Sequence, residues 1–84
     1  MSPADHSSER AAAIVVDARG LEPPEPMVRV LNALDELPRG ERLLMLIHVE
    51  PRPLFRVLER NQFAYRCELN PEGHFEVTIW HKSP

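Results

Sequence analysis

The sequence is poor in cysteine and has no long hydrophobic run. Its 84 residues contain one cysteine, Cys67, which excludes an intramolecular disulfide and a cysteine-based zinc site. No apolar run approaches the ~20 residues that cross a bilayer, so we expect no membrane segment. The polar segment 1–10 lacks the apolar stretch of a secretory signal. We therefore expect a cytoplasmic protein.

The sequence also lacks an excess of positive charge. It has 10 Lys and Arg against 13 Asp and Glu, for a formal net charge of −3. Because binding of phosphates requires a clustered basic surface, we expect no nucleic-acid partner. With 43% hydrophobic and 27% charged residues, the composition is that of one small globular domain. We expect this domain at 12–82, after a disordered tail at 1–11 that has no apolar pattern.

Short apolar segments predict the first two strands and both helices. Residues 13–16 are largely β-branched, and segment 42–48 contains the continuous apolar run 43–47, which favours strands, the second in the middle of a sheet. Apolar residues recur every three or four positions in 27–37 and 54–58. Each of these segments follows a group of prolines, which are favoured in the first turn of a helix.

Two segments of alternating polarity near the C-terminus predict a β-hairpin. Residues 63–69 and 74–80 flank Pro71-Glu72-Gly73, which is typical of a type I turn followed by a left-handed glycine. Pairing Asn70 with His74 puts six apolar side chains on one face, namely Tyr65, Cys67, Leu69, Phe75, Val77 and Ile79. The order is then βαβαββ. It predicts an α/β two-layer (α+β) sandwich, with two helices on one face of a four-stranded mixed sheet.

The central strand is apolar on both of its faces. Leu43, Met45 and Ile47 alternate with Leu44 and Leu46, so one set is expected to point away from the helices, beside Trp80. Apolar patches of this kind mark interaction sites. We expect this face to be covered by a partner or, in a homodimer, by a second copy.

The segment 16–26 reads Val-Asp-Ala-Arg-Gly-Leu-Glu-Pro-Pro-Glu-Pro. It resembles the D-x-R-G-L-x-C-P-x-P signature of the TusA/SirA-like sulfur-carrier family, except that Pro23 stands where that family has its persulfide-bearing cysteine. The resemblance extends over 13–81 and implies the fold predicted above. Segment 48–54, with its H-x-E-P-x-P-L pattern, resembles more specifically a branch of domains of unknown function without that cysteine. Because proline has no nucleophile, we expect a non-enzymatic binding or regulatory module.

Charged residues at the two strand-to-helix junctions form the candidate site. Since the carboxyl ends of parallel neighbouring strands lie together, we expect these residues to contact a protein partner or a small anion. They are Arg19, Glu22, Glu25, His48, Glu50 and Arg52. The alternative is that the acids only complement helix dipoles and the arginines pair with them.

Two other functions stay open. A sulfur-relay or redox protein would use Cys67 as its nucleophile, but the hairpin register places this thiol among core residues, where burial raises the pKa. A metal-binding protein would use His48 and Glu50, which are fewer ligands than a zinc site needs. We therefore expect no cofactor, no metal and no catalytic residue in the chain itself.

Overall fold

The computed structural model describes residues 12–83, so the tail predicted at 1–11 lies outside the described residues. The elements are β1 (Ile14–Asp17), α2 (Glu25–Leu34), β2 (Arg42–Ile47), α3 (Arg52–Arg60), β3 (Phe63–Leu69) and β4 (Phe75–His81). The predicted βαβαββ order is confirmed. Neither α2 nor α3 has the length and hydrophobicity that crossing a membrane requires.

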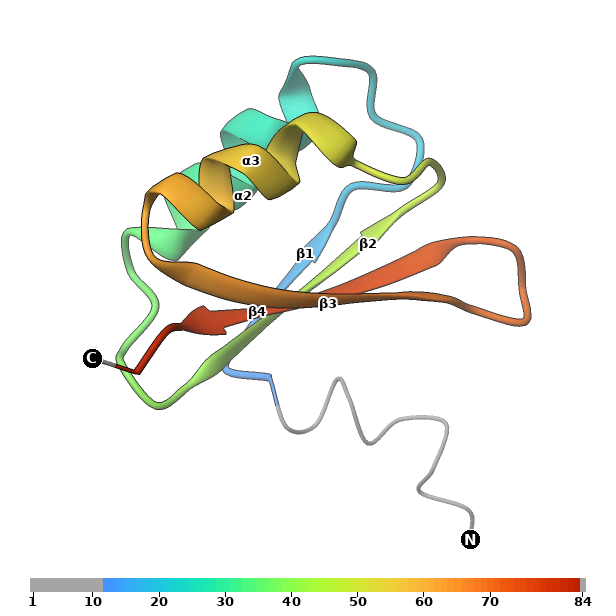
Figure 1. Cartoon of the computed structure of the whole chain (residues 1–84). Coiled ribbons are helices and arrows are strands. Elements are labelled where there is room, and N and C mark those ends of the chain that lie inside the picture. The colour runs from blue at the N-terminus through green and yellow to red at the C-terminus, as the bar shows by residue number, and fades with distance from the viewer. Residues whose placement is uncertain (1–11, 84) are drawn as a thin grey trace, which may run out of the picture.

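The strands form one mixed sheet in the order β1-β2-β4-β3. β1 runs parallel to β2, while β4 is antiparallel to both β2 and β3. Both helices cover the same face of this sheet (Figure 1). The predicted two-layer α/β arrangement is confirmed, and β2 occupies the interior position that its continuous apolar run indicates.

The β3–β4 hairpin has the predicted register. The amide of Asn70 donates to the carbonyl of His74 at 2.7 Å, and Cys67 pairs with Val77. Gly73 has a φ of 99° and donates its amide to the carbonyl of Asn70 at 2.9 Å, which closes the turn. Glycine is favoured here because a Cβ disfavours this left-handed backbone conformation.

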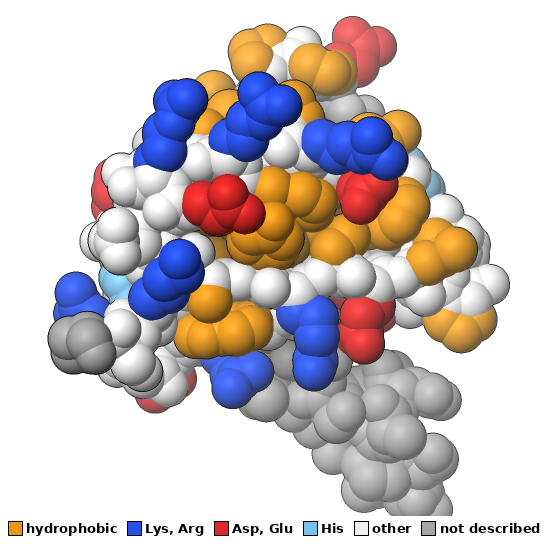
Figure 2. All heavy atoms as spheres, viewed as in Figure 1, with side chains coloured by type: hydrophobic (Ala, Val, Ile, Leu, Met, Phe, Trp, Pro, Cys, Tyr) orange, Lys and Arg blue, Asp and Glu red, His pale blue; other side chains and the backbone are white. Residues whose placement is uncertain are grey.

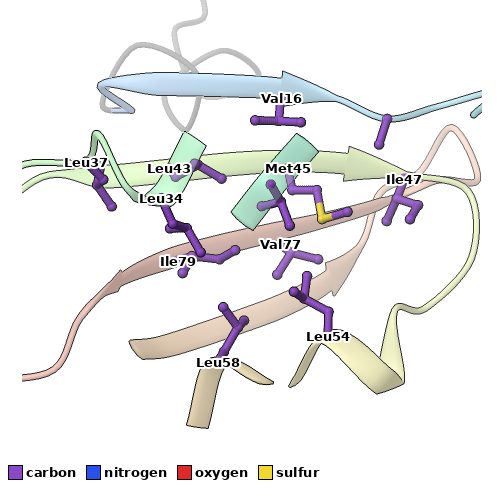
Figure 3. Packing of buried hydrophobic residues seen from close by; sticks show 12 residues of the cluster. Val16, Leu34, Leu37, Leu43, Met45, Ile47, Leu54, Leu58, Val77 and Ile79 are labelled. Carbon is purple, nitrogen blue, oxygen red and sulfur yellow. The ribbon is translucent and has the colours of Figure 1, made fainter. Parts of the chain in front are cut away.

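The hydrophobic core lies between the helices and the sheet. Leu43, Met45 and Ile47 of β2 point toward it, as Figure 3 shows. Leu54 and Leu58 of α3 close it from the helix side and are 1% and 0% exposed. Each such side chain contributes about 1.5–3 kcal/mol by leaving water, so this layer holds the domain together.

Helix α2 ends earlier than its apolar pattern predicts. The pattern extends to Leu37, whereas the helix stops at Leu34 and the chain continues in tight turns. Pro38 explains the difference, because a proline disfavours helical backbone at the residue before it. Leu37 is still buried, and its carbonyl accepts a hydrogen bond from the Nε2 of His81 at 2.9 Å.

The helix-free face is less exposed than we expected. Leu44 and Leu46 point away from the helices but are only 1% and 6% exposed. Val15, beside Leu44 in the sheet register, remains 44% exposed, and Trp80 is half-buried. The two leucines therefore do not form the open apolar patch that motivated a partner or a homodimer. Association through this face stays a prediction.

Candidate functional site

Both helices start from the same edge of the sheet. Because β1 and β2 are parallel neighbours, the chain leaves both strands at this edge and begins α2 and α3 side by side. The two strand-to-helix junctions enclose a cavity of about 670 Å³, lined by residues from segments 18–27 and 45–54. We call it the junction groove. It lies at the position where the sequence predicted a binding site.

The interior of the junction groove is mainly apolar. Met45 and Ile47 of β2 and Leu54 of α3 line it and also belong to the hydrophobic core. Its walls at the starts of the two helices are formed by Pro23, Pro24, Pro26, Pro51 and Pro53. The groove is therefore a continuation of the core to the surface. The backbone of its walls has little conformational freedom, because proline restricts φ.

Three of the six predicted site residues line the groove: Glu22, His48 and Glu50. All three are exposed. No lysine or arginine is among the residues that line it within the described part of the chain. The groove thus combines an apolar interior with two carboxylates and an imidazole.

Arg19, one of the three predicted residues outside the lining, pairs with Asp17. Its Nε and Nη2 donate to the two carboxylate oxygens at 2.9 and 2.8 Å. This hydrogen bonding lowers the pKa of Asp17 to about 2. The pair uses the guanidinium in the bidentate geometry that carboxylates favour, so Arg19 is turned toward β1 rather than toward the groove.

The other two, Glu25 and Arg52, also form local ion pairs. Glu25 accepts from Arg29, one helical turn on, at 3.1 Å, and Arg52 lies 3.2 Å from Glu50. The Arg52 side chain is 82% exposed, so this pair adds little to stability. Only the pair of Glu50 and Arg52 joins an acid and an arginine that the pairing alternative names, since the partner Arg29 was not predicted. Its four-residue spacing from Glu25 was the available signal.

The prolines also change what the two helix N-termini offer a ligand. Exposed amides make a helix N-terminus an anion site, but proline has none. Of the remaining amides, those of Glu25 and Arg52 donate to the carbonyls of Glu22 and Glu50 at 2.9 and 3.0 Å. The amide of Leu54 donates to the carbonyl of Pro51. The geometry thus disfavours a small anion at this junction.

Cys67 is not among the residues that line the groove, and it packs against the core from β3. Burial raises the pKa of its thiol, and the carboxylates of Glu50 and Glu68 raise it further. A thiol of this kind is a poor nucleophile at neutral pH. No cluster of three or more His, Cys, Asp or Glu able to hold a metal occurs in residues 12–83.

An aromatic contact between α3 and β3 escaped the sequence analysis. Phe55 stacks on Tyr65 with ring centroids 4.3 Å apart, and the Tyr65 hydroxyl donates to Glu59 at 3.0 Å. Burial and then this carboxylate raise the pKa of Tyr65. Figure 2 shows hydrophobic side chains gathered between α3 and β3, with charged groups on either side. The helical stripe gave no signal for Phe55, because the residue lies at its edge.

Comparisons with known proteins agree with the fold. The family model described as "Uncharacterized conserved protein (DUF2249)" matches residues 15–81. The crystal structure of a SirA-like protein from Desulfitobacterium hafniense is similar, with 26% sequence identity and a TM-score of 0.73 over 83% of this chain and 99% of that chain. No curated protein matches the chain. The predicted resemblance in fold is confirmed.

Proposed function

The chain belongs to the DUF2249 family of uncharacterized conserved proteins, and we propose that it is a non-enzymatic binding module of the cytoplasm. Its junction groove binds an apolar segment of a protein partner, flanked by lysine or arginine. The observation that carries this proposal is the pairing of an apolar, proline-walled groove with the carboxylates of Glu22 and Glu50, while no lysine or arginine of the described residues lines it.

Charge complementarity selects the partner's chemistry. Glu22 has no ion-pair partner among residues 12–83, and Glu50 has only the exposed Arg52. A basic residue on the partner gains an interaction with either carboxylate, whereas an acidic one is repelled. A small anion meets the same repulsion and finds few amides to bind. A partner segment therefore fits the groove better than an anion does.

The apolar interior supplies most of the affinity in this proposal. Burial of one large aliphatic side chain of the partner is worth about 1.5–3 kcal/mol. An exposed ion pair is worth about 0.2–1 kcal/mol. The rim charges consequently orient the segment and select against acidic sequences, while the exposed Val49 and the half-buried Leu21 and Met27 provide the contact surface.

The absence of a thiol among the described residues that line the groove supports a role without sulfur transfer. Pro23 lines the groove at the position that a cysteine occupies in the motif of sulfur carriers, and proline cannot carry a persulfide. Cys67 is not among the lining residues, and its raised pKa disfavours the thiolate. No observation favours the sulfur-relay or the metal-binding alternative over a binding module.

A peptide library displayed on phage tests the proposal directly. We expect selection on the full chain to enrich peptides with neighbouring apolar residues and an adjacent Lys or Arg. Binding of an enriched peptide is then measured by calorimetry. Glu22→Arg and Glu50→Arg are each expected to weaken it about three- to fivefold, the size of one exposed ion pair.

Glu36→Arg is the matched control, because Glu36 is exposed in the turn after α2, outside the groove. This variant makes the same charge reversal outside the groove. We expect the peptide affinity to change by less than about twofold, because salt screens a distant surface charge. Enrichment of acidic peptides, or equal loss of binding in the Glu36 variant, would contradict the proposal.

A further inference from the structure

A second hollow lies at the opposite end of β2 from the junction groove. It has a volume of about 400 Å³ and is lined by residues 39–42, at the start of β2, and residues 80–83, at the end of β4. The antiparallel register brings these segments together, because Arg42 pairs with Trp80. We call it the basic hollow.

The basic hollow gathers positive charge on a protein that is acidic as a whole. Arg39, Arg42 and Lys82 line it together with one carboxylate, Glu41, which leaves two uncompensated positive charges. None of the three cations forms an ion pair within residues 12–83, whereas other arginines, such as Arg29, do. Three cations that share one hollow with a single carboxylate repel one another, so an anion between them is stabilised.

One of these cations is held in place by an aromatic ring. The guanidinium carbon of Arg42 lies 4.9 Å from the centre of the Trp80 ring, within the range of a cation–π contact. A guanidinium carries all its N–H donors in its plane, so stacking on a ring leaves its edge available for two hydrogen bonds to an oxoanion. Less side-chain freedom is then lost on binding.

The backbone around the hollow is anchored. The amide of Lys82 donates to the carbonyl of Gln62 at 2.9 Å, which ties the end of β4 to β3. On the other side, the amide of Glu41 donates to the carbonyl of Pro38 at 3.2 Å and closes the turn that carries Arg39. The backbone positions from which Arg39 and Lys82 extend are thus fixed.

We propose that the basic hollow is a binding site for a doubly charged oxoanion of the phosphate type. Arg42 contributes the bidentate contact, and Arg39 and Lys82 contribute charge. The two uncompensated positive charges match a dianion better than a carboxylate. This site is independent of the partner proposed for the junction groove, which lies at the other end of β2.

Inorganic phosphate, titrated into the full chain by calorimetry at constant ionic strength, tests the site. We expect saturable binding of one phosphate per chain, with a change in fluorescence because Trp80 is the single tryptophan. Acetate under the same conditions is expected to bind about tenfold more weakly. Arg42→Gln should weaken phosphate binding about tenfold, and Arg39→Gln and Lys82→Gln about threefold each.

Arg56→Gln is the matched control, since Arg56 is an exposed arginine of α3 outside the hollow. It removes the same charge and is expected to leave phosphate affinity unchanged. Equal weakening of phosphate binding in the Arg56 and Arg42 variants would show that affinity depends only on the overall charge, and it would overturn the site. Acetate binding as tight as phosphate, or a response that never saturates, would overturn it as well. Circular dichroism of each variant verifies that the fold is kept.

Discussion

The two hollows at opposite ends of β2 differ in almost every physical property. The junction groove is apolar, opens from the hydrophobic core and has carboxylates at its rim. The basic hollow is smaller and is lined by cations around an indole. Prolines account for much of the contrast, because they remove from the groove the amide donors that a helix N-terminus otherwise presents. The same small fold thus offers two ends of opposite chemistry.

The two regions also differ in whether their arginines form ion pairs. Arg19, at the carboxyl end of β1, is bound to Asp17, whereas Arg39 and Arg42, at the amino end of β2, have no carboxylate partner in residues 12–83. A paired arginine contributes to stability and an unpaired one is available to a ligand. The presence of a carboxylate within reach decides which role each arginine has.

The largest effect that distinguishes the two ends is expected from Leu54→Ala. Leu54 is 1% exposed and lines the junction groove, so its truncation removes part of the core and is expected to cost about 2–5 kcal/mol of unfolding free energy. Urea denaturation measures this loss. Val28→Ala, in the 49% exposed side chain of the neighbouring helix α2, is the control and should cost less than about 0.5 kcal/mol. Equal costs would mean that the groove is not part of the core.

The reactivity of Cys67 is the next test, because this thiol packs against the core outside the groove lining. Since burial raises the pKa of this thiol, we expect iodoacetamide to label it several-fold more slowly in the folded chain than in urea. Mass spectrometry at about pH 8, near the ordinary pKa of a thiol, follows the reaction. Labelling as fast in the folded chain as in urea would revive the sulfur-relay alternative.

A smaller effect is expected when the paired arginine is removed. Arg19 lowers the pKa of Asp17 from 3.8 to about 2, so the folded state binds its proton less readily than the unfolded chain. The resulting stability is present above pH 3.8 and is lost as the pH falls toward 2. Because the Asp17 side chain is 51% exposed, solvent screening limits the contribution to about 0.5 kcal/mol.

Arg19→Gln should therefore lower the unfolding free energy at about pH 6 and leave it nearly unchanged at about pH 2, as measured by urea denaturation at both values. Arg39→Gln is the control, and we expect it to have no such pH dependence, since Arg39 has no acidic partner in residues 12–83. Equal losses of unfolding free energy in both variants at the higher pH would contradict the stabilising role of the pair between Arg19 and Asp17.

The smallest effect is expected for Pro23→Cys. Pro23 is exposed at the wall of the groove, and the resembled sulfur carriers have cysteine at this position, so the change in unfolding free energy should stay within about 0.5 kcal/mol. Chemical denaturation measures it. A loss beyond about 2 kcal/mol would show that this proline supports the start of α2.

Local patterns were enough to predict most of the fold. Alternating polarity and the turn at Gly73 gave the hairpin register residue by residue, because a shift of one position would have moved every apolar side chain to the other face. The end of α2 was predicted too late, since helical periodicity continues through Leu37 although the backbone has already left the helix. Periodicity indicates which side chains are buried, but it does not show whether the backbone that carries them is helical.

The candidate site was predicted only in part. The parallel pairing of β1 and β2 brought both junctions to one edge as expected, but only Glu22, His48 and Glu50 line the groove. Arg19 and Arg52 are turned to nearby carboxylates. Sequence gives the residue types at a junction, whereas the direction of a long charged side chain depends on which partner lies within reach.

The sequence by itself determined the element order, the proline-rich helix starts, the apolar central strand and the hairpin register, because each of these depends on neighbours within a few positions of the chain. Only the tertiary structure decided how deeply Leu44 and Leu46 are buried and which charges meet. The basic hollow is the plainest case, since residues 39–42 and 80–83 are far apart in the chain and come together only through the pairing of β2 with β4. Contacts between distant segments depend on how the strands are arranged in the sheet, which no local pattern records.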